Sequence, residues 1–200
     1  MTGLIRSSAF ALALVFLAGA RTTLACACCT HEGQRNVANV AIDSGKRQQI
    51  ESLRYGDKAK LFASEGDVTA IAGIATPSSS YDVTAKWVDN LLVFSLRGDD
   101  SRTGTLVLAR PKTISLFEID PRDSPDVGQG PTLYKEWKIS SPAAASGVFA
   151  PGTGPRQMLT LIIQGRGNNC TSDIDFTHWA LVMQGPKANY MLFGKLVTTR

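Results

Sequence analysis

Short apolar stretches with a two-residue period fill the chain from residue 57 onward, and this pattern constrains the fold more than any other feature. Apolar and polar residues alternate within each stretch, as in a strand that buries one face. Turn-forming Gly, Pro, Asp, Asn and Ser separate the stretches. Ten stretches show this pattern: 59–63, 68–75, 83–88, 91–96, 105–109, 113–119, 133–139, 158–164, 179–184 and 190–197. The sequence therefore predicts an all-β domain over 57–200.

We expect roughly eight to ten strands arranged as an antiparallel barrel or a two-sheet sandwich. Gly194 lies in the middle of a stretch, which favours the bend of a barrel. Aromatic residues on the strands are expected to fill the core or, in a hollow barrel, to line a ligand cavity. Segments 120–131 and 140–155 are rich in Pro, Gly, Ala and Ser and are predicted to be exposed connections.

Two hairpins make the strand pairing specific. A two-residue turn at Asp89–Asn90 pairs Trp87 with Leu92 and gathers the apolar side chains on one face. A second hairpin near the C-terminus pairs Met183 with Leu192 on the same argument. Each hairpin has one apolar face, as expected for an antiparallel sheet with one solvated side.

One short α-helix is predicted before the β domain, over 44–55. Ser44 is the expected N-cap, and Ile50 and Leu53 are three residues apart, as on one face of a helix. Gly56 follows as the stop signal. This helix belongs to a Cys-rich N-terminal segment over 26–56.

Residues 1–25 are predicted to be a secretory signal peptide. Arg6 precedes an apolar run over 9–20, and Arg21 and small residues follow it. The run is too short to cross a bilayer, so we expect no integral membrane segment after cleavage. We therefore predict an exported protein, periplasmic or extracellular. Lipoprotein processing before Cys26 is the alternative, and it would add a lipid anchor.

The charge balance argues against nucleic-acid binding. The chain has a formal charge of +4, but removing 1–25 lowers Lys plus Arg from 21 to 19 against 17 acidic residues. The remaining basic residues are scattered among acidic ones rather than forming a stripe. We expect a small molecule or a protein as the partner, and no nucleic acid.

The N-terminal cluster of Cys26, Cys28, Cys29 and His31 suggests two kinds of chemistry. Three thiols and an imidazole are soft donors that suit copper or zinc, although the spacing is not that of a zinc finger. In an oxidising compartment the same thiols form disulfides, and Cys170 has no other partner in the chain. We expect Cys170 to pair with Cys29 or Cys28, which closes a loop of roughly 140 residues.

A second polar cluster precedes the C-terminal strands. His178 with Asp173 or Asp175 supplies a base and an orienting carboxylate, but no nucleophile motif accompanies them. Asp175 and His178 point to opposite faces of a regular strand, so a dyad requires a loop or a bulge there.

The leading hypothesis is an exported, non-enzymatic β-domain protein that binds a ligand or partner, with its N-terminal cysteines linked to Cys170. The alternative is an envelope protein that binds copper or zinc through the N-terminal Cys/His cluster. A third, enzymatic hypothesis makes His178 the acid/base residue.

Overall fold

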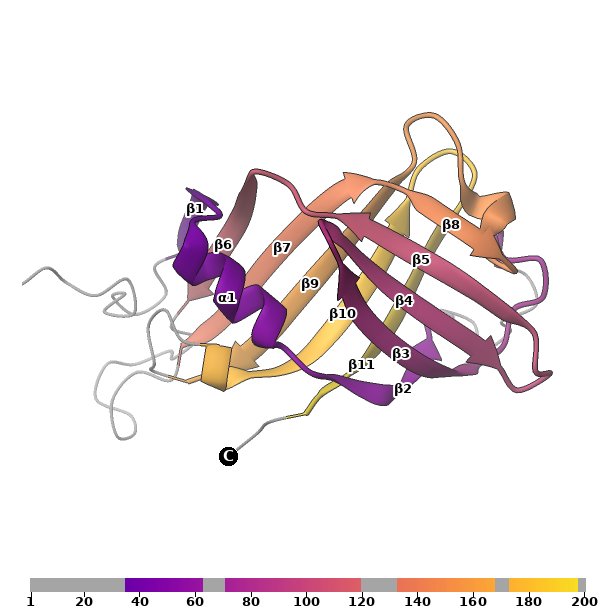
Figure 1. Cartoon of the computed structure of the whole chain (residues 1–200), viewed down its shortest axis with the longest axis horizontal. Helices are drawn as coiled ribbons and strands as arrows, with labels where there is room; N and C mark the ends of the chain where they lie inside the picture. The colour runs from indigo at the N-terminus through magenta and orange to yellow at the C-terminus, as the bar shows by residue number, and fades with distance from the viewer. Residues whose placement is uncertain (1–34, 63–70, 120–132, 168–172, 198–200) are drawn as a thin grey trace, which may run out of the picture.

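The computed structural model describes residues 35–62, 71–119, 133–167 and 173–197. Within these ranges the chain forms one α-helix, two 3-10 turns and eleven strands, all paired antiparallel, which confirms the all-β prediction. The strands are β1 (Arg35–Ala41), β2 (Tyr55–Leu61), β3 (Ser80–Val88), β4 (Leu91–Gly98), β5 (Thr103–Ala109), β6 (Thr113–Ile119), β7 (Tyr134–Pro142), β8 (Ala144–Gly147), β9 (Met158–Arg166), β10 (Phe176–Gln184) and β11 (Asn189–Leu196) (Figure 1).

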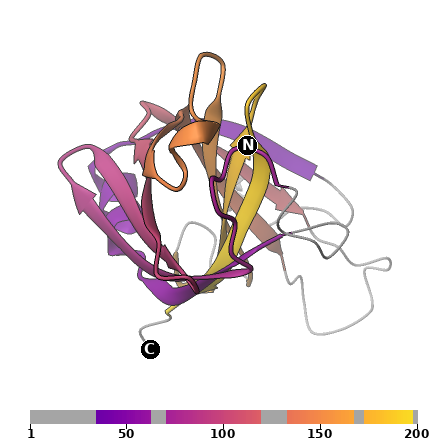
Figure 2. The ribbon, with the colours of Figure 1, turned by 90° about the vertical axis from the view of Figure 1, so that its right-hand side faces the viewer.

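The strands form one open sheet in the order β1-β6-β7-β9-β10-β11-β2-β3-β4-β5-β8. The sheet curls around its core (Figure 2). Only Ala143 separates β7 from β8, yet β7 pairs with β6 and β9 while β8 pairs with β5. Neither predicted arrangement is therefore correct in detail, because there is a single sheet and no ladder closes it. β6 and β9 pair with the two edges of β7, so β7 has no free edge on which β5 could pair to close the sheet. On that side the sheet continues through β6 and ends at β1.

The short helix α1 (Ser44–Ser52) is confirmed, with corrected ends. Asp43, rather than Ser44, is the N-cap, and its Oδ1 accepts a 2.7 Å hydrogen bond from the Lys46 amide. The helix ends at Ser52, three residues earlier than predicted, because Tyr55 already belongs to β2.

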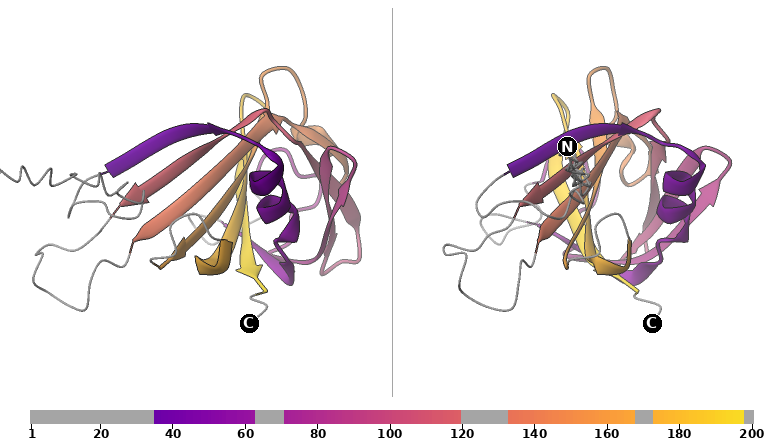
Figure 3. Two further views of the ribbon diagram at one scale, coloured as in Figure 1. Left: turned by 60° about the vertical axis from the view of Figure 1, so that its left-hand side comes forward. Right: turned by 90° about the vertical axis from the view of Figure 1, so that its left-hand side faces the viewer.

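Helix α1 closes a gap in the curled sheet. It lies across the opening between the β1–β6 side and the β3–β4 hairpin (Figure 3). Ile50 is only 1% exposed and Leu53 8%, so both residues of the predicted apolar face join the core.

Two strands have no alternation that could predict them. β1 is largely exposed and is a strand because it pairs with β6 over seven residues. β8 consists of Ala, Ser and Gly and pairs with β5. The predicted strand over 68–75 is not present at 71–75, and its first part lies outside the described residues.

The two predicted loops have different outcomes. Segment 120–131 lies outside the described residues. Segment 140–155 was expected to be an exposed connection, but it contains the end of β7, all of β8 and the 3-10 turn η2 (Ala150–Gly152). Phe149 in this segment is fully buried against Tyr81, with ring centroids 5.5 Å apart. Part of the predicted connection therefore belongs to the sheet, and Phe149 belongs to the core.

The first predicted hairpin register is confirmed, with Trp87 opposite Leu92. The second is wrong by two residues, since Met183 pairs with Tyr190 rather than Leu192. The reason is the buried side chain of Gln157, whose Nε2 donates to the Ala188 carbonyl at 2.6 Å and whose Oε1 accepts from the Lys187 amide at 3.1 Å. This side chain holds the turn over 185–188.

Side chains fill the interior of the curled sheet. Phe94, Trp179 and Leu161 are fully buried, and the Phe94 and Trp179 rings lie 5.5 Å apart. Tyr55 packs edge-on against both rings, at 5.0 and 5.9 Å. Of the two expectations for the strand aromatics, the packed core describes these residues.

Candidate functional site

Five of the predicted site residues, Cys26, Cys28, Cys29, His31 and Cys170, lie outside the described residues. The disulfide and the copper or zinc site therefore stay predictions. Within the described ranges no group of three or more His, Cys, Asp or Glu is placed to hold a metal ion. The same ranges contain no helix of the length and apolarity needed to cross a membrane.

The three candidate catalytic residues have different surroundings. His178 is exposed, and its Nδ1 is 2.8 Å from Thr177 Oγ1. A bulge does occur between Phe176 and His178, as the dyad would require. However, Asp173 and Asp175 are in the 3-10 turn η3 (Asp173–Asp175) and bind elsewhere, to Ser52 Oγ at 2.7 Å and Lys135 Nζ at 2.6 Å. A catalytic role for His178 stays a prediction.

The Asp175 contact belongs to a group of charges on the β6–β7 side of α1, which we call the ionic cluster (Lys46, Glu118, Lys135 and Asp175). Lys135 and Asp175 form an ion pair with side chains 2% and 10% exposed. Glu118 is opposite Lys135 in the β6–β7 ladder and is 8% exposed. Gly165 permits η3 to approach, because a Cβ there would overlap the Asp175 carbonyl oxygen.

Burial controls the electrostatics of the ionic cluster. It raises the pKa of Glu118, although the positive charges of Lys135 and Lys46 act in the opposite direction. One Glu118 oxygen, Oε2, has no hydrogen-bond partner. Burial also lowers the pKa of Lys46, whose Nζ is 4.0 Å from the centre of the Trp137 ring and 2.8 Å from Gln49 Oε1.

Two neighbouring recesses lie on the opposite side of α1, between the helix and the β3–β4 and β5–β6 turns, and we call them together the helix cleft. The first, of about 450 Å³, lies at the start of α1 and is lined by Arg47, Asn90, Arg110 and Lys112, among others. The second, of about 360 Å³, lies at the end of α1 and includes Leu53, Tyr55, Trp87 and Leu92 in its lining.

Arg110 connects the two recesses. Its side chain is 7% exposed and forms an ion pair with Glu51, which lines the second recess. The guanidinium Cζ lies 4.5 Å from the centre of the Trp87 ring, and Nη1 donates to Asn90 Oδ1 at 3.0 Å. Arg110 therefore lines one recess and contacts two residues that line the other.

Several buried polar atoms in the helix cleft have no hydrogen-bond partner. Among the described residues six buried side-chain polar atoms are unpaired, and three of them, Trp87 Nε1, Arg110 Nε and Tyr55 OH, belong to residues of this cleft. An unpaired buried donor costs about 1–3 kcal/mol in folding free energy. Burial also raises the pKa of Tyr55 well above its ordinary value, so its hydroxyl stays protonated. Such groups are unusual in native cores.

The cleft is also cationic. Arg47, Arg110 and Lys112 line the first recess, and Arg54 and Lys86 line the second. Against these five cationic side chains stand only two acidic ones, Asp43 and Glu51. Asp43 already caps α1, and Glu51 already binds Arg110.

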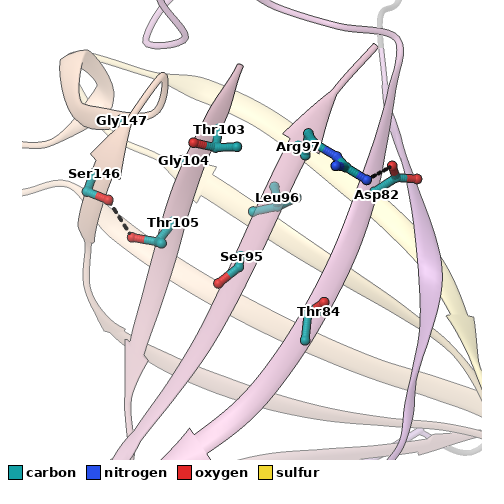
Figure 4. A pocket seen from close by; sticks show the side chains of 10 residues that line it. All are labelled: Asp82, Thr84, Ser95, Leu96, Arg97, Thr103, Gly104, Thr105, Ser146 and Gly147. Carbon is teal, nitrogen blue, oxygen red and sulfur yellow. Dashed lines mark hydrogen bonds and ion pairs between the residues drawn. The ribbon is translucent and has the colours of Figure 1, made fainter. Parts of the chain in front are cut away.

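A third hollow, of about 420 Å³, lies on the outer face of β3, β4, β5 and β8 (Figure 4). The hydroxyl-bearing residues Thr84, Ser95, Thr105 and Ser146 form a row across it, in register from strand to strand. Thr105 and Ser146 bond each other at 2.7 Å, and Arg97 and Asp82 pair at 3.0 Å. None of the unpaired buried atoms belongs to this hollow. The helix cleft is the stronger candidate.

Sequence reasoning missed the helix cleft because its residues are far apart in the chain and each looks ordinary alone. Trp87 is predicted as a hairpin residue and as one of the aromatics of the core or of a ligand cavity, but nothing in the local sequence of Arg110 marks it as buried. The ionic cluster did have a signal, since Lys135 and Glu118 occupy positions of their apolar stretches that point inward.

Comparisons with known proteins add no relationship. No family model, no curated protein and no solved structure matches the chain.

Proposed function

We propose that the protein is an exported, non-enzymatic β-domain protein that binds a ligand or partner in the helix cleft. The observation that carries this proposal is the set of unpaired buried groups in the cleft, Trp87 Nε1, Arg110 Nε and Tyr55 OH. A buried donor without a partner in the chain is explained by an acceptor that the chain does not supply, and a bound ligand is one such acceptor. Among the described residues, buried side chains pack the inner face of the curled sheet, which supports the helix cleft rather than the sheet interior as the place for a ligand.

The chemistry of these groups favours binding over catalysis. Indole and guanidinium N–H groups donate hydrogen bonds but do not change their protonation state near neutral pH. They orient and hold a ligand without acting as a general acid or base. His178, the candidate base from the sequence, is on β10 and does not line either recess.

The proposed disulfide between the N-terminal cysteines and Cys170 is supported by strand register. Arg35 pairs with Ile119, Ile119 with Tyr134, and Tyr134 with Arg166, so Arg35 and Arg166 lie three strand spacings apart. This distance is about 14 Å. Six residues lead from Arg35 back to Cys29 and four lead from Arg166 to Cys170. Extended chain of that length spans about 33 Å, which is more than enough for a bridge.

Intact mass of the protein recovered from an exporting host tests the exported and cross-linked state. We expect loss of 1–25 and a gain of four hydrogens on reduction, as two disulfides require. A mass that retains residues 1–25 contradicts export, and no change on reduction contradicts the bridge. A metal-sized excess under native conditions that disappears on denaturation supports the copper or zinc hypothesis instead.

A fragment screen tests the binding function. Small neutral, cationic and anionic compounds are added to the ¹⁵N-labelled protein, and the indole N–H signal of Trp87 is followed, identified by its loss in Trp87→Phe. We expect saturable shifts of this signal from at least one compound class. If no class shifts Trp87 or the backbone amides of α1, the proposed binding site is wrong.

A further inference from the structure

We infer that the helix cleft binds a small organic anion, a carboxylate carried on an apolar body, and that Glu51 occupies the place of the ligand carboxylate when the cleft is empty. This inference rests on the proposed binding function and names its ligand class.

The first recess supplies the charge. Arg47, Arg110 and Lys112 line it, and its one acidic residue, Asp43, points an oxygen at the backbone of α1. Arg110 is buried, whereas exposed Arg and Lys side chains interact weakly with anions because water screens them. Its unpaired Nε–H is a donor that neither Glu51 nor Asn90 uses. A guanidinium can bind a carboxylate through two N–H groups, and Nε with one terminal nitrogen is such a pair.

The second recess supplies the apolar contact. Leu53 and Leu92 are buried, and Trp87 presents its ring to the Arg110 guanidinium. Trp87 lines this recess, and its buried N–H is a further donor without a partner. A volume of about 360 Å³ is within the range of small-molecule sites. An acid with an apolar body therefore fits the two recesses better than a bare inorganic anion.

Glu51 is the group that a ligand must replace. It forms its ion pair with one terminal nitrogen of Arg110, while its side chain is 40% exposed. It is also 3.9 Å from Arg47, one helical turn earlier. On binding, the ligand carboxylate takes the Arg110 contact and Glu51 remains beside Arg47 in solvent. One carboxylate exchanges for another, so no buried charge is left unpaired.

The test is an NMR titration with 4-phenylbutyrate and with 4-phenylbutanamide, its neutral analogue of the same shape. The side-chain N–H signals of Trp87 and Arg110 are followed in the full chain. We expect saturable shifts of both signals with the carboxylate and none with the amide. Inorganic phosphate at the same concentration should give weaker shifts, because it lacks the apolar body.

Variants then test the exchange with Glu51. Glu51→Gln removes the competing carboxylate and should tighten 4-phenylbutyrate binding by about three- to tenfold, the effect of one partly exposed charge. Arg47→Gln with Lys112→Gln should weaken it by about the same factor. The matched control is Lys60→Gln with Lys195→Gln, which removes the same charge from exposed positions outside the cleft and should leave binding unchanged.

Each contrary result has its own meaning. Equal shifts from the amide overturn the anion inference but leave a binding cleft intact. If Glu51→Gln binds 4-phenylbutyrate as wild type does or more weakly, the ligand carboxylate does not replace Glu51 on Arg110. If neither probe shifts Trp87 while the fragment screen gives neutral or cationic hits there, the ligand class is wrong and the binding function stands. If the screen also gives no hit, both fail.

Discussion

The two sides of helix α1 both contain buried polar groups, but they satisfy them differently. In the ionic cluster, Lys135 and Asp175 neutralise each other, and the unpaired atom is a carboxylate oxygen of Glu118. A carboxyl group can respond to burial by binding a proton, as the raised pKa of Glu118 indicates. In the helix cleft the unpaired atoms of Trp87 and Arg110 are N–H donors.

Those donors cannot be removed by titration, because indole has no acidic proton in this range and arginine stays charged. Protonation can therefore remove the buried negative charge of Glu118, whereas no change of protonation removes the N–H donors of the helix cleft. Burial of charge alone therefore does not identify a binding site. Whether the unpaired atom is an acceptor that can bind a proton or a donor that cannot lose one says more about the need for a ligand.

The largest expected effect is from breaking the buried ion pair. Lys135→Ala leaves Asp175 without its cation and should cost about 3–5 kcal/mol in unfolding free energy. Urea denaturation measures this loss. Lys138→Ala is the matched control, because in its 3.1 Å pair with Glu136 the Lys138 side chain is 45% exposed, so the pair should contribute less than about 1 kcal/mol. Equal losses in the two variants would contradict a structural ion pair.

Removing the cation of the helix cleft should cost less. Arg110→Ala removes the guanidinium from Trp87, but Glu51 is partly exposed and regains water. We expect a loss of about 1–3 kcal/mol in unfolding free energy, measured by the same denaturation. Arg47→Ala, in the exposed pair with Glu51, is the control and should change stability by less than about 0.5 kcal/mol. A loss above that of Lys135→Ala would reverse the comparison between the two regions.

The pH dependence of stability should identify Glu118. Its pKa is higher in the folded state, so the folded chain holds the proton more tightly than the unfolded chain. Its contribution is fully present below the unfolded pKa and is lost as pH rises through the folded pKa. Glu118→Gln should remove this dependence, and the melting temperature of the variant relative to wild type should rise between pH 4 and 7. If the melting temperatures of the variant and of wild type change in parallel with pH, the pKa of Glu118 is not raised by folding.

The smallest effect is expected at Trp87. Trp87→Phe keeps a ring beneath Arg110 and removes only the unpaired indole N–H. Stability without ligand should change by less than about 1 kcal/mol, since no hydrogen bond is lost. Thermal unfolding monitored by far-UV circular dichroism measures the difference. A loss greater than about 2 kcal/mol would mean that the indole N–H has a partner.

The sequence predicts the local parts of this fold, including the pair of Trp87 and Leu92 that lines the second recess, but not the meeting of Trp87 with Arg110. The Trp87–Leu92 register follows from one turn and one apolar face, so local information is sufficient. β1 depends on β6, more than 70 residues away, and has no alternation of its own. Trp87 and Arg110 meet only because β4 and β5 bring them together over 23 residues. The sequence does carry a signal for the ionic cluster, because Lys135 lies two residues before Trp137 on the face of β7 that points inward.

The Gln157 side chain has a consequence for the order in which the chain assembles. The two hydrogen bonds that fix the turn between β10 and β11 come from a residue 30 and 31 positions upstream. The hairpin therefore lacks, within its own sequence, the group that selects its register. We therefore expect a hairpin over 176–197 to acquire its native register only after the segment that carries Gln157 and β9 has docked. Correct pairing at the C-terminus then depends on contacts between residues distant in the sequence.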